Sequence, residues 1–82
     1  MKIIFSPKAG KRLLRLPVNQ GLKITQKIRV LDKNPFAGKS LAGKLKGFYS
    51  LRSWPYRIIY QIFKDRGVLL IDTIEHRQGV YK

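Results

Sequence analysis

The chain of 82 residues contains no cysteine, only four acidic side chains and a single histidine. Without cysteine it has no disulfide framework and no thiolate metal site. One histidine and four scattered carboxylates also make a poor set of metal ligands, so we expect neither a metal nor any other cofactor. No apolar run approaches the ~20 residues that a membrane span requires, and we expect no membrane-embedded segment.

The length is that of one domain with one modest core, which we expect to span residues 1–82. The sequence passes from Met1-Lys2 directly into the short apolar run Ile3-Ile4-Phe5. A secretory leader would carry a longer apolar segment ending in small residues. We therefore expect no signal peptide and a cytoplasmic location, which also fits the absence of cysteine.

What the chain has in abundance is positive charge. Eighteen Lys and Arg residues outnumber the four acids, and the formal net charge is +14. Such a charge destabilises the compact state by self-repulsion, which a polyanion or an acidic partner relieves. Nucleic acid is the first candidate partner and an acidic protein the second. A membrane surface ranks third, because the apolar residues are needed for the core.

The first half of the chain has the pattern of one strand followed by two helices. Residues 2–5 form the expected strand, and Ser6-Pro7 supplies a helix N-cap and a first helical residue. Pro17 ends the first helix, and the second runs from about 18 to 33, where Asn34-Pro35 stops it. Two consecutive helices separated by a proline predict an αα-hairpin.

The second half changes to a period of two, which is typical of strands. Residues 36–47, with three glycines and three lysines, form an expected basic loop. Strands are expected at 49–53, 56–63 and 68–74, joined by two tight turns. The apolar run of the last strand predicts burial on both faces in the centre of the sheet. The order β-α-α-β-β-β predicts an α+β fold, in which the N-terminal strand and two-helix hairpin precede a three-stranded antiparallel meander and the helices cover one face of the sheet.

One motif points toward nucleotide binding and does not fit it. Residues 38–44 match the phosphate-loop pattern G-x-x-x-x-G-K. The next residue is Leu45, where Ser or Thr would bind magnesium, and no strand immediately precedes the loop. We do not expect this segment to bind a nucleotide.

Two short segments near the C-terminus carry the side chains best suited to chemistry, Tyr56-Arg57-Ile58-Ile59-Tyr60 and His76-Arg77-Gln78-Gly79-Val80-Tyr81. If the turn between them is symmetric, Arg57 lies opposite Ile74 and therefore close to the second segment. A symmetric turn before the first segment places Arg52 opposite Arg57. Three strands then bring arginine and histidine to one end of the sheet.

Like charges directly opposite each other on a sheet are destabilising, so a bound anion is a natural reason for this arginine cluster. The planar fork of arginine bonds phosphate oxygens bidentately. The alternative is that the arginines are solvated surface positions or pair with Glu75 and Asp72. Histidine is a side chain suited to proton transfer, so His76 is a candidate for that role, with a structural or merely exposed role as its alternative. Tyr81 is suited to stacking on a base or orienting a phosphate, or to closing the core at the C-terminus.

Taken together, four segments resemble the RelE/ParE superfamily of type II toxin–antitoxin toxins. They are Lys44-Leu45-Lys46-Gly47, Leu51-Arg52, Tyr56-Arg57-Ile58-Ile59-Tyr60-Gln61-Ile62 and His76-Arg77-Gln78-Gly79-Val80-Tyr81. The N-terminal strand, the two helices and the length also agree, so the resemblance covers nearly the whole chain. It implies a small basic toxin that a co-encoded acidic antitoxin neutralises by folding on its basic surface. Operator DNA would be reached only through the toxin–antitoxin complex.

The superfamily divides in function. RelE-like members cut messenger RNA in the ribosomal A site, whereas ParE-like members poison DNA gyrase. The RelE-like chemistry is metal-free: the ribose 2′-OH attacks the adjacent phosphodiester with the help of a base, cationic stabilisation and an acid. On this chain the resemblance implies phosphate stabilisation by Arg57, a place near the leaving group for Arg77 and substrate positioning by Tyr81. His76 would serve as the base or the acid.

The chain departs from the RelE-like pattern at Phe48 and Ser50, where some relatives have lysines. Lys44, Lys46 and Arg52 are the expected phosphate-binding side chains in their place. Our leading expectation is a ribosome-dependent messenger RNA endonuclease that inhibits translation. The open alternatives are a ParE-like gyrase inhibitor that acts by protein–protein binding, and an inactive toxin-fold protein that only binds its antitoxin.

Overall fold

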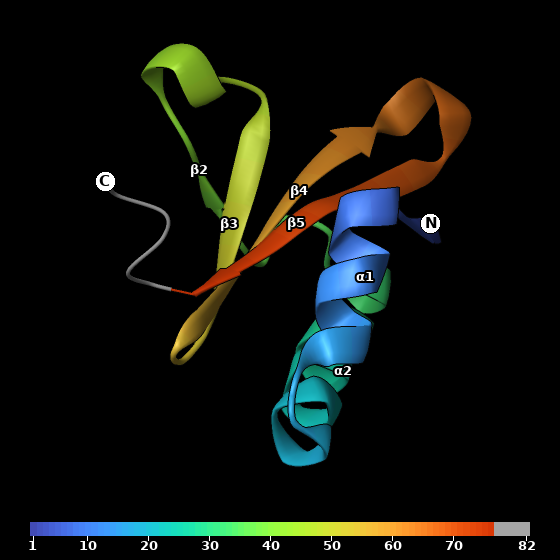
Figure 1. Ribbon diagram of the computed structural model, residues 1–82. Helices are drawn as coiled ribbons and strands as arrows, with labels where there is room; N and C mark the ends of the chain where they lie inside the picture. Colours follow the sequence, from blue (N-terminus) through green and yellow to red (C-terminus); the bar gives the residue numbers. More distant parts are fainter. Residues whose placement is uncertain (77–82) are drawn as a thin grey trace.

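The computed structural model describes residues 1–76, which form one five-stranded sheet and two α-helices (Figure 1). The expected α+β class and the expected order of the main elements are confirmed. The elements are β1 (Lys2–Phe5), α1 (Pro7–Arg15), α2 (Val18–Lys33), β2 (Lys39–Ser40), β3 (Phe48–Ser53), β4 (Tyr56–Phe63) and β5 (Val68–His76), with short 3₁₀ helices at Gly43–Leu45 and Lys64–Arg66.

The sheet is larger than the predicted meander. Its strand order is β1-β5-β4-β3-β2, so the antiparallel meander β3–β4–β5 is present and gains a neighbour on each side. β1 pairs in parallel with β5, and the two-residue strand β2 pairs antiparallel with β3. β5 is interior, as expected. In its first half burial alternates: Leu69 and Ile71 are fully buried, whereas Leu70 between them is half-buried. In its second half Thr73 and Ile74, which point to opposite faces, are both buried. The expected burial on both faces therefore holds only for the second half of this strand.

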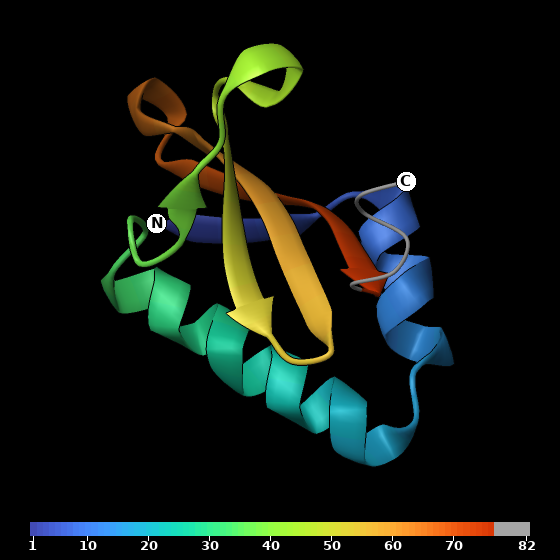
Figure 2. The ribbon, with the colours of Figure 1, turned by 90° about the vertical axis from the view of Figure 1, so that its left-hand side faces the viewer.

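Both helices pack on the same face of the sheet. Figure 2 shows α2 crossing beneath the lower ends of β3 and β4, near the turn that joins them, while α1 stands beside β5. Among the residues that the structure describes, neither helix is long and apolar enough to cross a membrane. The buried core joins both helices to the central strands through Ala9, Ile24, Ile28, Leu31, Ile58, Tyr60, Leu69, Ile71 and Ile74.

The opposite face of the sheet carries no helix, and we call it the open face. Because side chains alternate along a strand, the residues next to the core residues Ile58 and Tyr60 point to this open face, as do their partners on neighbouring strands. From the edge strand inward, these partners are Lys39, Ser50, Arg52, Arg57, Ile59, Thr73 and Glu75.

A β-bulge changes the register between β4 and β5. Tyr60 pairs with Ile71, but the preceding residue Ile59 pairs with Thr73, which leaves Asp72 as the extra residue. A symmetric turn alone does not reveal this insertion. The bulge moves the partner of Arg57 by one position to Glu75, so the expected pairing of Arg57 with Ile74 is wrong.

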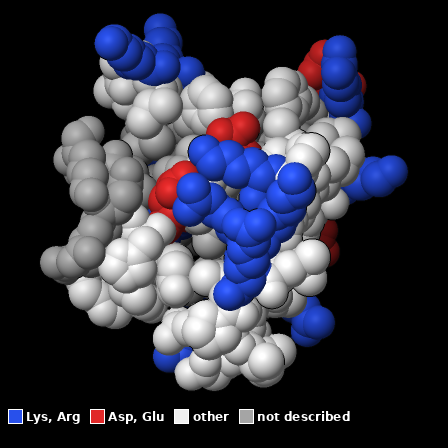
Figure 3. All heavy atoms as spheres, viewed as in Figure 1, with Lys and Arg blue, Asp and Glu red and all other residues white. Residues whose placement is uncertain are grey.

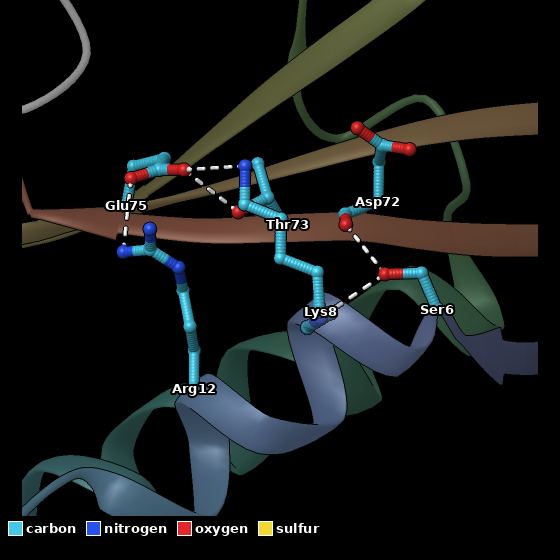
Figure 4. A network of polar contacts seen from close by, with 7 residues as sticks. Ser6, Lys8, Arg12, Asp72, Thr73 and Glu75 are labelled. Atoms are coloured by element: carbon cyan, nitrogen blue, oxygen red, sulfur yellow. Dashed lines mark hydrogen bonds and ion pairs between the residues drawn. The ribbon is translucent and has the colours of Figure 1, made fainter.

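Ser6 connects the start of α1 to this bulge. Its Oγ accepts a hydrogen bond from the Ala9 amide at 3.0 Å, as an N-cap does. The same hydroxyl donates to the carbonyl oxygen of Asp72 at 2.6 Å. Figure 4 shows the hydroxyl pointing from the first turn of α1 toward β5. The predicted N-cap is confirmed, and it also bonds the carbonyl of the bulged residue.

We expect a Ser6→Ala variant to lose about 1–2 kcal/mol of unfolding free energy, because it removes the N-cap and leaves the Asp72 carbonyl without this donor. For a domain of this size the melting temperature should fall by roughly 5–10 °C. Thermal melting followed by circular dichroism measures the change. Ser40→Ala on the exposed edge strand is the matched control and should change stability by less than ~0.5 kcal/mol. Equal melting of the two variants would contradict this account of Ser6.

Tyr60 is the largest fully buried side chain of the core. Its hydroxyl donates to the Pro35 carbonyl at 2.8 Å and accepts from the Gly38 amide at 3.0 Å. Its ring stacks on Tyr49 with 5.4 Å between centroids. Burial raises the pKa of the Tyr60 phenol, while the hydrogen bond from Gly38 acts in the opposite direction and the nearby Tyr49 adds to the rise.

We predict that one of the four tyrosines ionises later than an ordinary phenol when the folded protein is titrated with base. Above about pH 10 an unfolded chain releases this proton while the folded chain retains it, so stability falls as the pH rises further. Absorbance of tyrosinate follows the titration. Tyr60→Phe should remove the late component, whereas Tyr56→Phe should leave it in place. A late component that survives Tyr60→Phe would mean that another tyrosine is responsible.

Candidate functional site

Two arginines face each other across the β3–β4 hairpin. Arg52 pairs with Arg57, as the sequence predicts, and both side chains point to the open face. The neighbouring strand places Glu75 beside Arg57. A row of arginine, arginine and glutamate therefore crosses three adjacent strands at one end of the sheet. The two cations at the β3–β4 end of this row form the core of the candidate site.

A hollow lies next to this arginine pair on the open face. Its volume is about 660 Å³. β2 contributes Lys39, which pairs directly with Ser50 on β3. The hollow thus combines three cations and a hydroxyl with three apolar side chains, and it contains no acidic side chain. The three cations suit a phosphodiester. Its lining residues are Ala37, Lys39, Leu41, Ser50, Leu51, Arg52 and Arg57.

Lys39 is a candidate site residue that the sequence does not single out. The sequence predicts only a basic loop for Lys39, Lys44 and Lys46, because a two-residue strand is too short to show a period of two. Its pairing with Ser50 places it on the open face. The only available signal was its position between Gly38 and the predicted strand at 49–53.

The carboxylate of Glu75 is not reserved for the arginine pair, because two side chains of α1 also bind it. Arg12 lies 3.1 Å and Lys8 3.5 Å from its two oxygens. Thr73 donates its hydroxyl to the same carboxylate at 2.8 Å. Figure 4 shows both α1 side chains reaching up to the carboxylate at β5. One acid is thus shared among several cations, and this end of the molecule keeps an excess of positive charge.

The surface over α1 is strongly basic. Figure 3 shows Lys and Arg atoms gathered over this helix, with acidic atoms at the border of the group. α1 has no acidic residue in its first turn and contributes four cations, Lys8, Lys11, Arg12 and Arg15. This surface is a natural docking area for an acidic partner.

His76 ends β5 on the other face of the sheet. It pairs with Tyr56, and the two rings form an edge-on contact with 5.4 Å between centroids. Since Glu75 points to the open face, the next residue along the strand points away from it. The structure therefore brings His76 to the same end of the sheet as Arg52 and Arg57, but it does not place the three side chains on one face.

The other predicted site residues lie elsewhere or outside the described chain. Lys44 lies in the 3₁₀ helix Gly43–Leu45, which precedes β3, and Lys46 is the residue that follows this helix. The five residues from Phe48 to Arg52 span about 13 Å of strand, so these lysines lie at the opposite end of β3 from the arginine pair. Figure 1 shows that segment and the β3–β4 turn at opposite ends of the hairpin. Arg77 and Tyr81 lie outside the described residues.

Within residues 1–76, no three His, Cys, Asp or Glu side chains are grouped as metal ligands would be. The segment that matches the phosphate-loop pattern contains β2 and the start of a 3₁₀ helix, and it precedes no α-helix. A phosphate loop needs a strand before it and a helix after it. The structure thus has no phosphate loop at this segment.

Comparison with known families decides the relationship. A family model described as the ParE toxin of the type II toxin–antitoxin system parDE matches residues 3–81. The chain belongs to this family. It is a toxin of the RelE/ParE superfamily, as its motifs indicate.

Solved structures agree with this assignment. The toxin–antitoxin complex RelBE2 from Mycobacterium tuberculosis contains a chain that is 27% identical, with a TM-score of 0.85 over 93% of this chain and 96% of that one. A YoeB/ParE toxin from Agrobacterium tumefaciens is 23% identical, with a TM-score of 0.81 over 93% of this chain and 98% of that one. The RelBE complex of E. coli gives 19% identity and a TM-score of 0.78 over 92% and 94%. The last two show a shared fold. A search of curated protein sequences gives no match.

Proposed function

We infer that this toxin is a ribosome-dependent messenger RNA endonuclease that works without a metal. The observation that carries the inference is the pairing of Arg52 with Arg57 on the open face, beside a hollow that Lys39 also lines. Like charges held opposite each other raise the energy of the free protein. A phosphodiester placed between them turns that repulsion into two charge-assisted interactions.

In the proposed reaction the ribose 2′-oxygen forms a bond to the adjacent phosphorus, and the bond from phosphorus to the 5′-oxygen of the next nucleotide breaks. The 2′-OH loses a proton, and the departing 5′-oxygen gains one. Negative charge grows on the phosphoryl oxygens in the transition state, where fixed cations are most effective. Arg57 is the proposed stabilising residue, with Arg52 holding the same phosphate.

The proton-transfer groups are proposed from the resemblance to RelE-like toxins. His76 is the proposed base or acid, Arg77 is placed near the leaving group, and Tyr81 positions the substrate. His76 lies at the correct end of the sheet, as the last residue of β5. Its side chain leaves β5 on the face away from Arg57, so the substrate would have to pass over the end of this strand to meet both groups.

Lys39 is proposed to supply the cation that Ser50 lacks. Some RelE-like relatives are expected to carry a lysine at the position of Ser50, and here Lys39 stands directly across the β2–β3 ladder from that serine. Directly opposed residues have Cβ atoms about 5 Å apart. The long side chain of Lys39 can therefore cover the same part of the hollow from the neighbouring strand.

We expect Lys39→Ala to slow message cleavage by roughly tenfold, which is the effect of losing one partly solvated charge contact. Lys39→Arg should keep most of the activity, because the charge remains. The double variant Lys44→Ala/Lys46→Ala is the control for a general loss of basic charge and should cleave at close to the normal rate. If the control loses more activity than Lys39→Ala, the cation comes from the other end of β3.

A second candidate function is inhibition of DNA gyrase by protein–protein binding. The matching family is the ParE toxin family, and His76 and Arg57 point to opposite faces of the sheet. Both observations favour a toxin without nuclease chemistry. In that case the basic surface would bind a protein, and the arginine pair would be part of the contact.

Controlled expression in a bacterial host separates the two functions. The endonuclease predicts prompt arrest of translation, with messages cut within translated regions and detected by primer extension. The gyrase inhibitor predicts an SOS response and an accumulation of gyrase-cleaved DNA, with intact messages. The second pattern would overturn the proposed endonuclease. Normal growth with stable, folded toxin would overturn both proposals.

The proposed regulatory partner is an antitoxin with an acidic segment. Relatives of similar fold have been solved in toxin–antitoxin complexes. Besides its basic surface, this chain exposes Leu14 by 87%, Val18 by 80% and Leu22 by 60% around the junction of α1 and α2. A segment that carries both acidic and apolar side chains would complement this region. The affinity of such a complex should fall as salt is raised, and a salt-insensitive complex would contradict the electrostatic part of this proposal.

A further inference from the structure

A second groove lies between α2 and the turn that joins β3 to β4. Its volume is about 660 Å³. Figure 2 shows α2 passing close to this turn, on the side of the sheet away from the open face. The groove is lined by Lys23, Gln26, Lys27, Val30, Arg52, Ser53 and Trp54.

The helical wall of the groove follows from the spacing of its residues. Positions 23, 26, 27 and 30 fall at i, i+3, i+4 and i+7 and so share one side of α2. This stripe runs beside the core stripe of Ile24, Ile28 and Leu31. Lys23 and Lys27 repel each other at a separation of four residues, and none of the described residues that line the groove is acidic. The wall is therefore a row of positive charge with an apolar end at Val30.

The opposite wall carries the single tryptophan of the chain. Trp54 has the largest aromatic side chain of the sequence, yet it is 60% exposed and not part of the core. Large exposed aromatic rings beside lysines recur where proteins bind single-stranded nucleic acid, because bases stack on the ring while the cations follow the phosphates. Val30, which is 48% exposed, adds an apolar surface next to it.

Arg52 joins this groove to the candidate site. It lines both the groove beside α2 and the hollow on the open face that contains Arg57 and Lys39. The two depressions therefore meet at the β3–β4 end of the sheet. A polymer lying on the arginine pair can continue past Arg52 without leaving the basic surface.

We propose that the groove between α2 and the β3–β4 turn is a binding site for single-stranded RNA. A base stacks on Trp54, Lys23 and Lys27 contact the phosphates that flank it, and the strand continues over Arg52 to the open face. The extension toward the open face rests on the proposed endonuclease function. Binding of RNA in the groove needs no ribosome and no cleavage, so it is tested separately.

The sole tryptophan provides the probe. The intact toxin is titrated with an oligouridylate of about eight nucleotides, a length within the usual site size for single strands, while Trp54 fluorescence is recorded. We expect saturable quenching that weakens as salt is raised. Duplex RNA, whose bases are already stacked, should quench much less. Absence of quenching at concentrations where the oligonucleotide demonstrably binds would overturn the proposal.

Variants locate the site by a second measurement, the anisotropy of the labelled oligonucleotide. Trp54→Ala should weaken binding roughly tenfold through the lost stacking. The double variant Lys23→Ala/Lys27→Ala should weaken it and lower the slope of log affinity against log salt by about 1.4, the value for two phosphate contacts with a single strand. The double variant Lys2→Ala/Arg66→Ala also loses two positive charges, but at the far end of the sheet. Its affinity should stay within about twofold of the parent, and that small loss measures the effect of net charge alone.

Three results would contradict the site. The two double variants would lose affinity equally if the RNA were held by net charge alone. A polyglutamate peptide of similar length would quench Trp54 as strongly as the RNA if the groove served an acidic protein segment. A DNA oligonucleotide that bound more tightly than RNA would contradict the assignment to RNA. Failure of message cleavage with intact quenching would count against the proposed endonuclease and not against this groove.

Discussion

An Arg57→Ala variant should cut messages on the ribosome about a hundred- to a thousand-fold more slowly than the parent toxin, the usual cost of removing one group that stabilises transition-state charge. Growth arrest on expression should be relieved accordingly. Arg57 points to the open face opposite Arg52 and lines the hollow there. The interaction is proposed to strengthen as charge grows on the phosphoryl oxygens, so turnover should fall more than ribosome binding does.

Two controls make this prediction specific. Arg57→Lys keeps the charge but loses the planar fork, and it should recover only part of the activity. Arg66→Ala removes an exposed arginine from the 3₁₀ turn at the other end of β4 and should leave the activity unchanged. Melting curves establish that each variant is folded. Full activity of a folded Arg57→Ala protein would remove Arg57 from the proposed site.

A Gly38→Ala variant should be among the least stable single substitutions in the chain. A Cβ atom at this position would lie 2.5 Å from the Tyr60 hydroxyl and 2.9 Å from the Ser50 carbonyl oxygen. Tyr60 cannot move aside easily, because it is fully buried and its hydroxyl is bonded to Pro35 and Gly38. We expect a loss of about 3 kcal/mol and a fall in melting temperature of roughly 15 °C, measured by denaturant and thermal unfolding.

Gly10→Ala is the matched control for this prediction. Gly10 lies within α1, and a Cβ atom there would meet nothing within 4 Å. Alanine favours a helix over glycine by about 0.5–1 kcal/mol, so this variant should be slightly more stable than the parent. If Gly38→Ala unfolds at the same temperature as the parent, the backbone around Tyr60 adapts far more easily than its packing implies.

Helix-capping residues and prolines in the sequence predict most of the helical part of the fold. Ser6-Pro7 begins α1, Pro17 separates the helices, and α2 runs from Val18 to Lys33 as expected. These signals act within a few residues of the positions they control, since capping and proline geometry are local effects. A single sequence therefore carries them fully.

The sheet was harder to predict, because strand pairing joins residues far apart in the chain. The turn at 64–67 predicts the pairs close to it, such as Phe63 with Val68. It does not reveal that Asp72 is inserted as a bulge, and that insertion moves Arg57 from Ile74 to Glu75. β2 was missed because two residues show no periodicity, and the parallel pairing of β1 with β5 has no local signature.

The dependence of strand pairing on distant residues also explains which parts of the candidate site the sequence predicts. The pairing of Arg52 with Arg57 follows from a tight hairpin and is present. The direction of His76 depends on the register after the bulge, and alternation places it on the face away from Arg57. Lys39 is a candidate because β2 places it opposite Ser50, and this pairing has no signature in the sequence. The roles assigned to Arg77 and Tyr81 stay predictions.

The most direct test of the central claim is the rate at which purified toxin cuts a defined message on translating ribosomes, compared between two double variants. The account predicts that Arg52→Ala/Arg57→Ala loses nearly all cleavage, whereas Lys44→Ala/Lys46→Ala, which removes equal charge at the other end of β3, cleaves at close to the parent rate. An intact message with the parent toxin, or equal losses in the two variants, would contradict the proposal that the arginine pair on the open face is the site of RNA cleavage.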